Sequence, residues 1–174
     1  MIRTLLEDVS RDGNLTLCVS LTPSGAMDEG SARMLKEIGA WMRINGEGIY
    51  GSRAWKVFAE GEMVKDSLKP DAPGKLRGMP GGKLDKIHAD FSFSTKDFRF
   101  TQGKDGAVYA FCLTVPKPEE QIRIVNLGAG SASVKSVTLL GSSEKLCWKQ
   151  QDDALIINCP GKMDFSYSVC FKIL

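Results

Sequence analysis

The chain has 174 residues, of which 43% are hydrophobic and 25% charged, an ordinary composition for a globular protein with a buried core. Its length allows one full domain, or a small domain plus a fragment. The net charge of +2 is too small to indicate a nucleic-acid partner, and no apolar run approaches the roughly eighteen residues that a membrane span needs.

The first residues predict a helix over 2–10. Its apolar face, at spacings of three, one and three, is made by Ile2, Leu5, Leu6 and Val9. We expect Gly13 to take the left-handed conformation just past the helix end. Residues 1–8 hold no apolar signal-peptide core and have the pattern of the middle of a helix. We therefore expect Met1 to be an internal or truncated start.

Residues 15–21 alternate strictly in size, which predicts a β-strand. The large side chains on one face are Leu15, Leu17, Val19 and Leu21, and the small ones on the other are Thr16, Cys18 and Ser20. A strand with both faces apolar or small is normally buried on both sides.

A turn cluster at residues 22–25 leads into a second predicted helix, over 28–45. Its apolar stripe consists of Met34, Leu35, Ile38, Trp41 and Met42. Asp28 suits the N-cap, and Gly46 suits the position after the last turn. Helix, strand and helix form a piece of a parallel α/β fold, because a parallel strand requires a neighbour on each side. Residues 1–54 supply only one strand.

From about Trp55 the pattern changes to short strand-like runs separated by turn residues at intervals of roughly ten. The predicted strands cover residues 57–58, 91–93, 98–100, 107–115, 121–125, 134–140, 146–149, 154–157 and 167–173. Residues 65–86 are rich in Gly, Pro and Lys and predict a long surface loop. Within that loop, Gly78–Lys83 lacks the spacing of a phosphate-binding loop.

The cysteines and the single histidine do not indicate a metal site. The five cysteines stand singly, without CxxC spacing, and are Cys18, Cys112, Cys147, Cys159 and Cys170. We expect them to be small buried hydrophobic residues, and their odd number argues against a disulfide framework. His88 has no partner residues at metal-ligand spacing and is expected to lie in a turn or on the solvent side.

Residues 38–55, from Ile38 to Trp55, carry the most specific motif of the chain. This run resembles the IGxWxxxNGEAIYGTRPW segment of glycoside hydrolase family 29 α-L-fucosidases, which leads out of their catalytic barrel. Residues 2–17 are similar to the family's IRxLVDVVSKxGNLLL passage, and the chain then departs from it at Cys18, Ser20 and Leu21. Residues 98–101, 108–110 and 137–141 follow the order of motifs in the family's C-terminal domain.

The resemblance implies a mainly β fold in two parts. Residues 1–54 would be the terminal α-β-α remnant of a (β/α)8 catalytic barrel. Residues 55–174 would be a C-terminal antiparallel β-sandwich domain of about eight strands. The family's periplasmic or secreted location would follow, although this chain by itself indicates no compartment.

The resemblance also implies hydrolysis of terminal α-L-fucose by a retaining mechanism, which uses two carboxylates and no cofactor. Both carboxylates would belong to barrel segments before residue 1, so no catalytic residue is assigned and this chain alone is expected to be inactive. Its partners would be the upstream catalytic barrel and, in the complete enzyme, a fucosylated glycan. Ser20, Thr22 and Ser24, at the mouth of the barrel, are the candidate sugar contacts.

Other candidate residues have a structural and a functional interpretation. Glu47 is more readily a capping or interdomain hydrogen-bonding residue than a catalytic acid. Tyr50, Arg53 and Trp55 would lock the β-domain against the barrel helices, with Trp55 as a buried anchor. Phe98, Tyr109 and Trp148 are expected in the core. If they were exposed, they would form a sugar-stacking platform, and the chain would be a noncatalytic carbohydrate-binding or interaction module.

Overall fold

A computed structural model of the chain describes residues 1–61, 64 and 92–174. The predicted loop over 65–86, the Gly78–Lys83 run and His88 lie outside these residues. The described helices are α1 (Ile2–Val9), α2 (Glu29–Asn45) and the short 3-10 helices η1 (Gly46–Gly48) and η2 (Val125–Leu127). The strands are β1 (Arg53–Glu60), β2 (Phe98–Gln102), β3 (Val108–Cys112), β4 (Gln121–Ile124), β5 (Val137–Leu139), β6 (Cys147–Gln150), β7 (Leu155–Asn158) and β8 (Val169–Ile173).

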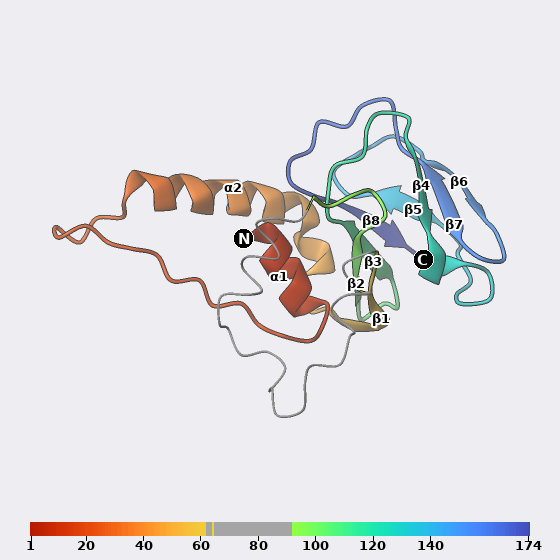
Figure 1. Cartoon of the computed structure of the whole chain (residues 1–174), viewed down its shortest axis with the longest axis horizontal. Coiled ribbons are helices and arrows are strands. Elements are labelled where there is room, and N and C mark those ends of the chain that lie inside the picture. The colour runs from red at the N-terminus through yellow and green to blue at the C-terminus, as the bar shows by residue number, and fades with distance from the viewer. Residues whose placement is uncertain (62–63, 65–91) are drawn as a thin grey trace.

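These eight strands form two antiparallel sheets, which confirms the mainly β fold. One sheet has five strands in the order β1-β2-β3-β8-β5, and the other has three in the order β4-β7-β6. Helices α1 and α2 lie on the side of the five-stranded sheet that faces away from the three-stranded sheet (Figure 1).

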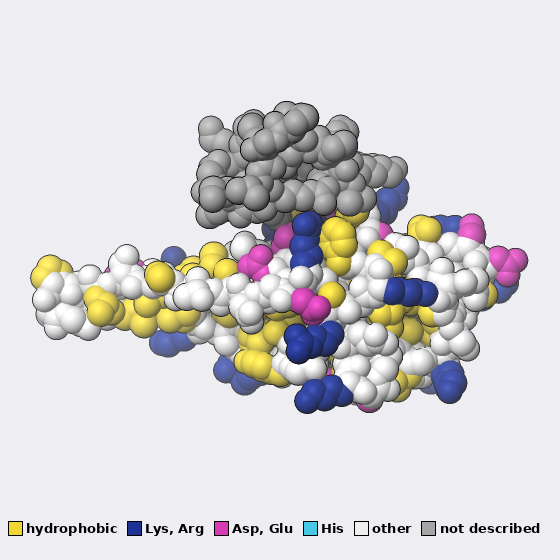
Figure 2. Space-filling view, turned by 90° about the horizontal axis from the view of Figure 1, so that it is seen from below, with side chains coloured by type: hydrophobic (Ala, Val, Ile, Leu, Met, Phe, Trp, Pro, Cys, Tyr) yellow, Lys and Arg dark blue, Asp and Glu magenta, His cyan; other side chains and the backbone are white. Residues whose placement is uncertain are grey.

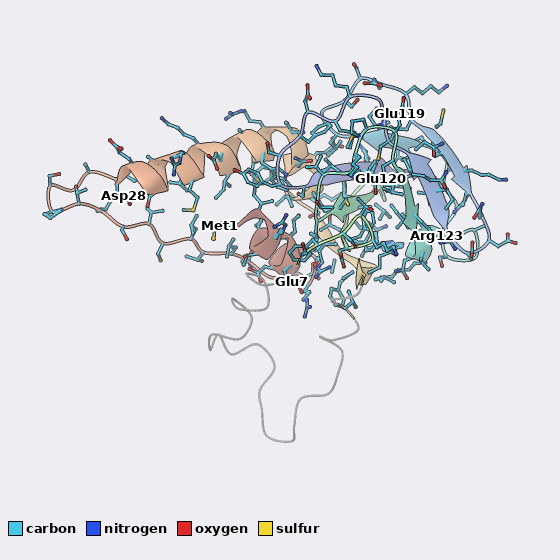
Figure 3. All side chains as sticks on the ribbon, turned by 45° about the horizontal axis from the view of Figure 1, so that its top comes forward. Met1, Glu7, Asp28, Glu119, Glu120 and Arg123 are labelled. Atoms are coloured by element: carbon cyan, nitrogen blue, oxygen red, sulfur yellow. The ribbon has the colours of Figure 1, made fainter. Side chains whose placement is uncertain are left out.

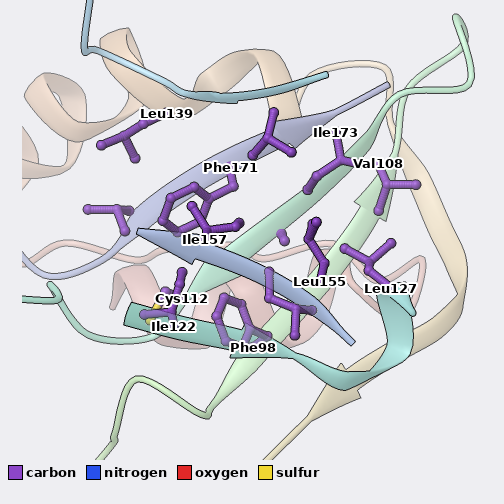
Figure 4. Close-up of a cluster of buried hydrophobic side chains, with 14 of the residues drawn as sticks. Phe98, Val108, Cys112, Ile122, Leu127, Leu139, Leu155, Ile157, Phe171 and Ile173 are labelled. Atoms are coloured by element: carbon purple, nitrogen blue, oxygen red, sulfur yellow. The ribbon is translucent and has the colours of Figure 1, made fainter. Parts of the chain in front are cut away.

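The space between the two sheets holds the larger hydrophobic core. Figure 4 shows Phe98 and Phe171 of the five-stranded sheet facing Ile122, Leu155 and Ile157 of the three-stranded sheet. All five side chains are fully buried. Because strand side chains alternate, one set of alternate residues in each sheet provides this inter-sheet core.

Strand β3 is buried on both of its faces, unlike an ordinary strand at the surface of a sandwich. Val108, Ala110 and Cys112 point into the inter-sheet core. Tyr109 and Phe111 point the other way, into a second cluster beneath the helices. A continuous apolar run in an antiparallel strand therefore reflects cover on its outer face.

The end of α1 differs from the prediction for Gly13. Asp12, not Gly13, takes the left-handed conformation, with φ of 60°. Gly13 instead donates its N–H to the carbonyl oxygen of Asp8 at 2.8 Å. A Cβ at Gly13 would lie 2.9 Å from that oxygen, so the glycine is needed for close approach.

Helix α2 begins and ends as its pattern predicts. The Asp28 carboxylate accepts a hydrogen bond from the Ser31 N–H at 2.9 Å, which confirms Asp28 as the N-cap. Gly46 follows the last helical residue but has φ of −61°, so it is not a left-handed terminator. A Cβ there would lie 2.9 Å from Cε2 of Tyr50, which favours glycine for a different reason.

The strand predicted over residues 15–21 does not form. Residues 14–20 make no backbone hydrogen bond within the described residues, and Leu21 forms only an isolated bridge with Met27. The predicted alternation in burial is still present, because Leu15, Leu17 and Val19 are half-buried while the residues between them are exposed. Leu21 is 63% exposed. A strand needs a partner for its backbone groups, and the described residues offer none here.

Two further predictions are corrected. Ser92 and Phe93 are not in a strand, and Phe91 is not described. The Asp97 carboxylate accepts a hydrogen bond from the Ser94 N–H at 2.8 Å, which forms a turn before β2. The prediction of buried cysteines is right for Cys112, Cys159 and Cys170 but wrong for Cys18 and Cys147, which are exposed.

Candidate functional site

Helices α1 and α2 and the short helix η1 contact the outer face of the five-stranded sheet through both apolar and polar side chains, and we call this contact the helix–sheet seam. Its apolar part joins Leu6 of α1 and Trp41 of α2 to Tyr109 and Phe111 of β3. The ring centroids of Trp41 and Phe111 are 6.1 Å apart. The seam therefore extends the core of the β-domain onto both helices.

A buried ion pair fixes α1 to β2 within this seam. Arg99 is 2% exposed and its Nε donates to the Glu7 carboxylate, which also pairs with Arg11. Burial by itself raises the pKa of Glu7, but the two guanidinium groups outweigh it and hold that pKa below its usual value. Figure 3 labels Glu7 on α1, on the side near the sheets.

Two polar contacts hold the ends of α1. Nε of Arg3 donates to the carbonyl oxygen of Leu113 at 2.8 Å, just after β3. At the other end, the Asp12 carboxylate accepts a hydrogen bond of 2.7 Å from the N–H of Ala54 in β1. The left-handed conformation of Asp12 thus places its carboxylate against the neighbouring strand.

Glu47 occupies the seam as a link between η1 and the sheet. Its Oε1 accepts a hydrogen bond from the Tyr109 hydroxyl at 2.9 Å and pairs with Nζ of Lys172. The hydrogen bond from Lys172, followed by that from Tyr109, lowers the pKa of Glu47. Burial and the bond to Glu47 raise the pKa of Tyr109 to about 12. A carboxylate held ionised between two donors acts as a structural link, which is the role that the sequence favours.

The backbone of η1 touches the sheet directly. The hydroxyl of Thr101 donates to the carbonyl oxygen of Gly48 at 2.6 Å. A Cβ at Gly48 would lie 2.7 Å from Cζ of Phe111 and 2.9 Å from Cγ of Tyr109. Glycine is therefore required for this approach.

The connection from β7 to β8, residues 159–168, crosses α2, and we call it the strap. The Trp41 Nε1–H donates to the carbonyl oxygen of Ser168 at 3.0 Å. The Tyr167 hydroxyl donates to the Glu37 carboxylate at 2.5 Å. The strap thus ties the C-terminal half of α2 to the β-domain.

The structure separates three residues that were predicted to lock the β-domain against the helices. Trp55 is buried, as expected, but it stacks against Phe100 in the inter-sheet core, with ring centroids 5.3 Å apart. Arg53 is exposed, and Tyr50 is 74% exposed. The lock is instead made by Glu7, Trp41 and Glu47.

The three aromatic residues considered for a sugar-stacking platform do not form one. Phe98 and Tyr109 are buried in different clusters on opposite faces of the five-stranded sheet. Trp148, on β6, packs half-buried against the inter-sheet core. This confirms the core interpretation for Phe98 and Tyr109.

The residues 14–20, which form no helix or strand, are called the extended segment here. The candidate barrel-mouth residues lie at its end and in the turn that leads from it to α2. The hydroxyls of Thr22 and Ser24 are 2.9 Å apart, and the Thr22 hydroxyl also donates to the Ala26 carbonyl oxygen at 3.0 Å. Gly25 has φ of 81°, which closes the turn. Ser20 is exposed, and the structure does not join it to this pair of hydroxyls.

Among the described residues, no group of histidine, cysteine, aspartate or glutamate side chains could hold a metal ion. None of the helices within residues 1–61 and 92–174 is both long and apolar enough to span a bilayer.

Sequence reasoning missed Glu7, Arg99 and Lys172 as seam residues. One signal was present in the outward-facing positions of β3, where Tyr109 and Phe111 are too apolar for a solvent-facing surface. Arg99 gave no such signal, because a charged residue between two inward-facing phenylalanines has the alternation of an ordinary solvent-facing position. The apolar positions of β3 do not identify what covers them.

Comparison with known proteins gives two matches to one family. The α-L-fucosidase family matches residues 1–47, and the α-L-fucosidase C-terminal domain matches residues 92–174. Plasma α-L-fucosidase of Homo sapiens is 32% identical over 71 residues, which is 41% of this chain and 14% of that protein. Tissue α-L-fucosidase of Rattus norvegicus is 25% identical over 162 residues, which is 92% of this chain and 27% of that protein.

Solved structures share the fold. The crystal structure of Thermotoga maritima α-fucosidase aligns with 99% of this chain and 33% of its own, with a TM-score of 0.69 and 22% identity. The chain therefore spans 14% to 27% of the length of the two curated relatives above and a third of this structural neighbour.

Proposed function

Because the chain belongs to the α-L-fucosidase family, we propose that it is the C-terminal portion of a retaining glycoside hydrolase that acts on α-L-fucosides. Its role would be to support the catalytic barrel. The helix–sheet seam carries this proposal. It fixes α1 and α2 to the β-domain while the extended segment between them keeps its backbone groups unpaired within the described residues.

The extended segment has the properties of an interior strand of a parallel sheet. Its backbone donors and acceptors are available on both edges, and its larger side chains share one face. Figure 2 shows the arm formed by this segment and the start of α2, with hydrophobic side chains along it. The preceding strands of a (β/α)8 barrel would satisfy these groups, so the proposed partner is an upstream barrel.

On this proposal, residues 1–54 belong to the barrel and residues 55–174 form the β-domain. The turn at Ser20, Thr22 and Ser24 would form part of the barrel mouth, where enzymes with this fold bind substrate. One neighbouring structure is Thermotoga maritima α-fucosidase in complex with fucose, which supports a fucosylated glycan as the substrate class.

The proposal is tested first by assaying the purified 174-residue chain on an aryl α-L-fucoside. The expected result is no release of nitrophenol, because the two carboxylates of a retaining glycosidase are not assigned to any of its residues. Measurable hydrolysis would contradict the supporting role. The second test is the nucleotide sequence upstream of the Met1 codon. An open frame that encodes barrel strands supports the proposal, whereas an in-frame stop codon with no such coding sequence opposes it.

A further inference from the structure

The extended segment has an open backbone edge. Residues 14–20 make no backbone hydrogen bond among the described residues. Leu21, which follows them, forms its isolated bridge with Met27, so the turn closes one edge at that end and leaves the other edge open. A row of unpaired N–H and C=O groups on an extended chain is a template for pairing with another chain.

The charges along this edge do not oppose such pairing. Natural edge strands are commonly protected by charged side chains, which repel a second strand. Residues 13–27 contain no charged residue, although 25% of the whole chain is charged. Two copies of this segment can therefore approach each other without bringing like charges together.

The order of the side chains fits an antiparallel copy of the same segment. Residues 15–21 have Cys18 at their centre and read Leu-Thr-Leu-Cys-Val-Ser-Leu. Side chains directly opposite each other in an antiparallel pair lie on the same face. The register that places Cys18 opposite Cys18 therefore puts large side chains opposite large ones and small opposite small. It also pairs all seven residues, whereas a shift by one residue would mix the two faces.

Apolar side chains on this part of the molecule are left exposed. Leu21 is 63% exposed and Met27 is 40% exposed. Figures 1 and 2 show that the arm that carries them projects away from the two sheets. In the register centred on Cys18, Leu21 would pack against Leu15 of the second copy, which removes apolar surface from water.

We propose that the 174-residue chain forms a two-fold symmetric dimer in which residues 15–21 of two copies pair antiparallel, with Cys18 at the symmetry axis. Such a contact uses the same surface on both copies and closes at two chains. This inference goes beyond the proposed supporting role. Barrel strands and a second copy would compete for the same edge, so self-pairing is expected of the chain on its own.

Sedimentation velocity of the purified chain tests the proposal, with an expected species of twice the mass of one chain. Cys18→Lys should raise the dissociation constant of the dimer at least about 3-fold, because like charges directly opposite each other destabilise a strand pair. Cys18 is exposed, so this change should leave the fold intact. The matched control is Cys147→Lys, an equal change of charge at an exposed cysteine on the edge strand β6, which should leave the dissociation constant unchanged.

Cross-linking tests the register. Directly opposite residues have Cα atoms about 4.5–5.5 Å apart, within the range of about 4.4–6.8 Å that a disulfide spans. In Cys147→Ser, an added oxidant that takes two electrons and two protons from the two Cys18 thiols should give a disulfide-linked dimer on a non-reducing gel. Cys18→Ser, which keeps Cys147, should give far less of it.

Four results would overturn the proposal. They are a monomer at high micromolar concentration, an assembly larger than a dimer, a dimer that Cys18→Lys does not weaken, and a dimer in which Cys18 does not cross-link. None of them bears on the supporting role, which the fucoside assay and the upstream coding sequence test separately.

Discussion

The indole Nε1–H of Trp41 donates a hydrogen bond of 3.0 Å to the carbonyl oxygen of Ser168, 127 residues later in the chain. The same indole packs against Phe111 of β3. One side chain of α2 therefore contacts both the strap and the outer face of the sheet, and it helps fix the position of the helix relative to the β-domain.

Replacing Trp41 with Phe tests this anchor. The change keeps an aromatic ring but removes the N–H and leaves the Ser168 carbonyl oxygen without its donor. We expect the free energy of unfolding to fall by about 1–3 kcal/mol, measured by urea denaturation with circular dichroism. Trp148→Phe is the control and should cost less, because Trp148 is only half-buried and lies on an edge strand. An equal loss in both variants would contradict the anchoring role of Trp41.

The ion pair between Glu7 and Arg99 gives a second prediction. Glu7→Gln leaves the buried Arg99 guanidinium without a charged partner, so we expect a loss of about 2–4 kcal/mol in the free energy of unfolding. Asp153→Asn is the matched control, because Asp153 and its partner Arg123 are exposed. Exposed pairs contribute about 0–1 kcal/mol. Similar small losses in the two variants would show that the seam does not depend on Glu7.

The lowered pKa of Glu7 also predicts how stability depends on pH. A carboxyl group with a lower pKa in the folded state contributes stability above its unfolded value, here 4.5, and loses that contribution as the pH falls through the folded pKa. The difference in unfolding free energy between the parent and Glu7→Gln should therefore be constant near neutral pH and shrink below pH 4.5. Denaturation series across that range would measure it. A difference that stays constant into the acid range would contradict the pairing.

The close approach of η1 to the sheet gives a fourth prediction. In Gly48→Ala the added methyl group would meet Phe111 and Tyr109 at distances below 3 Å. We expect a loss of about 1–3 kcal/mol from overpacking, read from the denaturation midpoint. Gly161→Ala is the control, because a Cβ there meets nothing within 4 Å. If Gly48→Ala were as stable as Gly161→Ala, η1 would have to be free to shift away from the strand.

Local patterns in the sequence are sufficient to predict most of the elements. The cap at Asp28 and the 3.6-residue stripe predict α2, and the spacing of turn residues predicts the β-sandwich. The run from Ile38 to Trp55 is specific enough to indicate the family from the residues alone. Each of these signals is contained within a few turns or one strand, where short-range geometry decides the outcome.

The contacts that could not be predicted join residues that are distant in sequence. The Arg99 side chain meets Glu7, 92 residues earlier, and the Tyr109 hydroxyl meets Glu47, 62 residues earlier. Periodicity shows which face of a strand is buried but not what covers that face. The segment over 15–21 illustrates the same limit, because its alternation specifies a strand but a strand forms only beside a partner. The local elements and the family thus follow from short stretches of residues, whereas the seam arises only from the way in which those elements pack together.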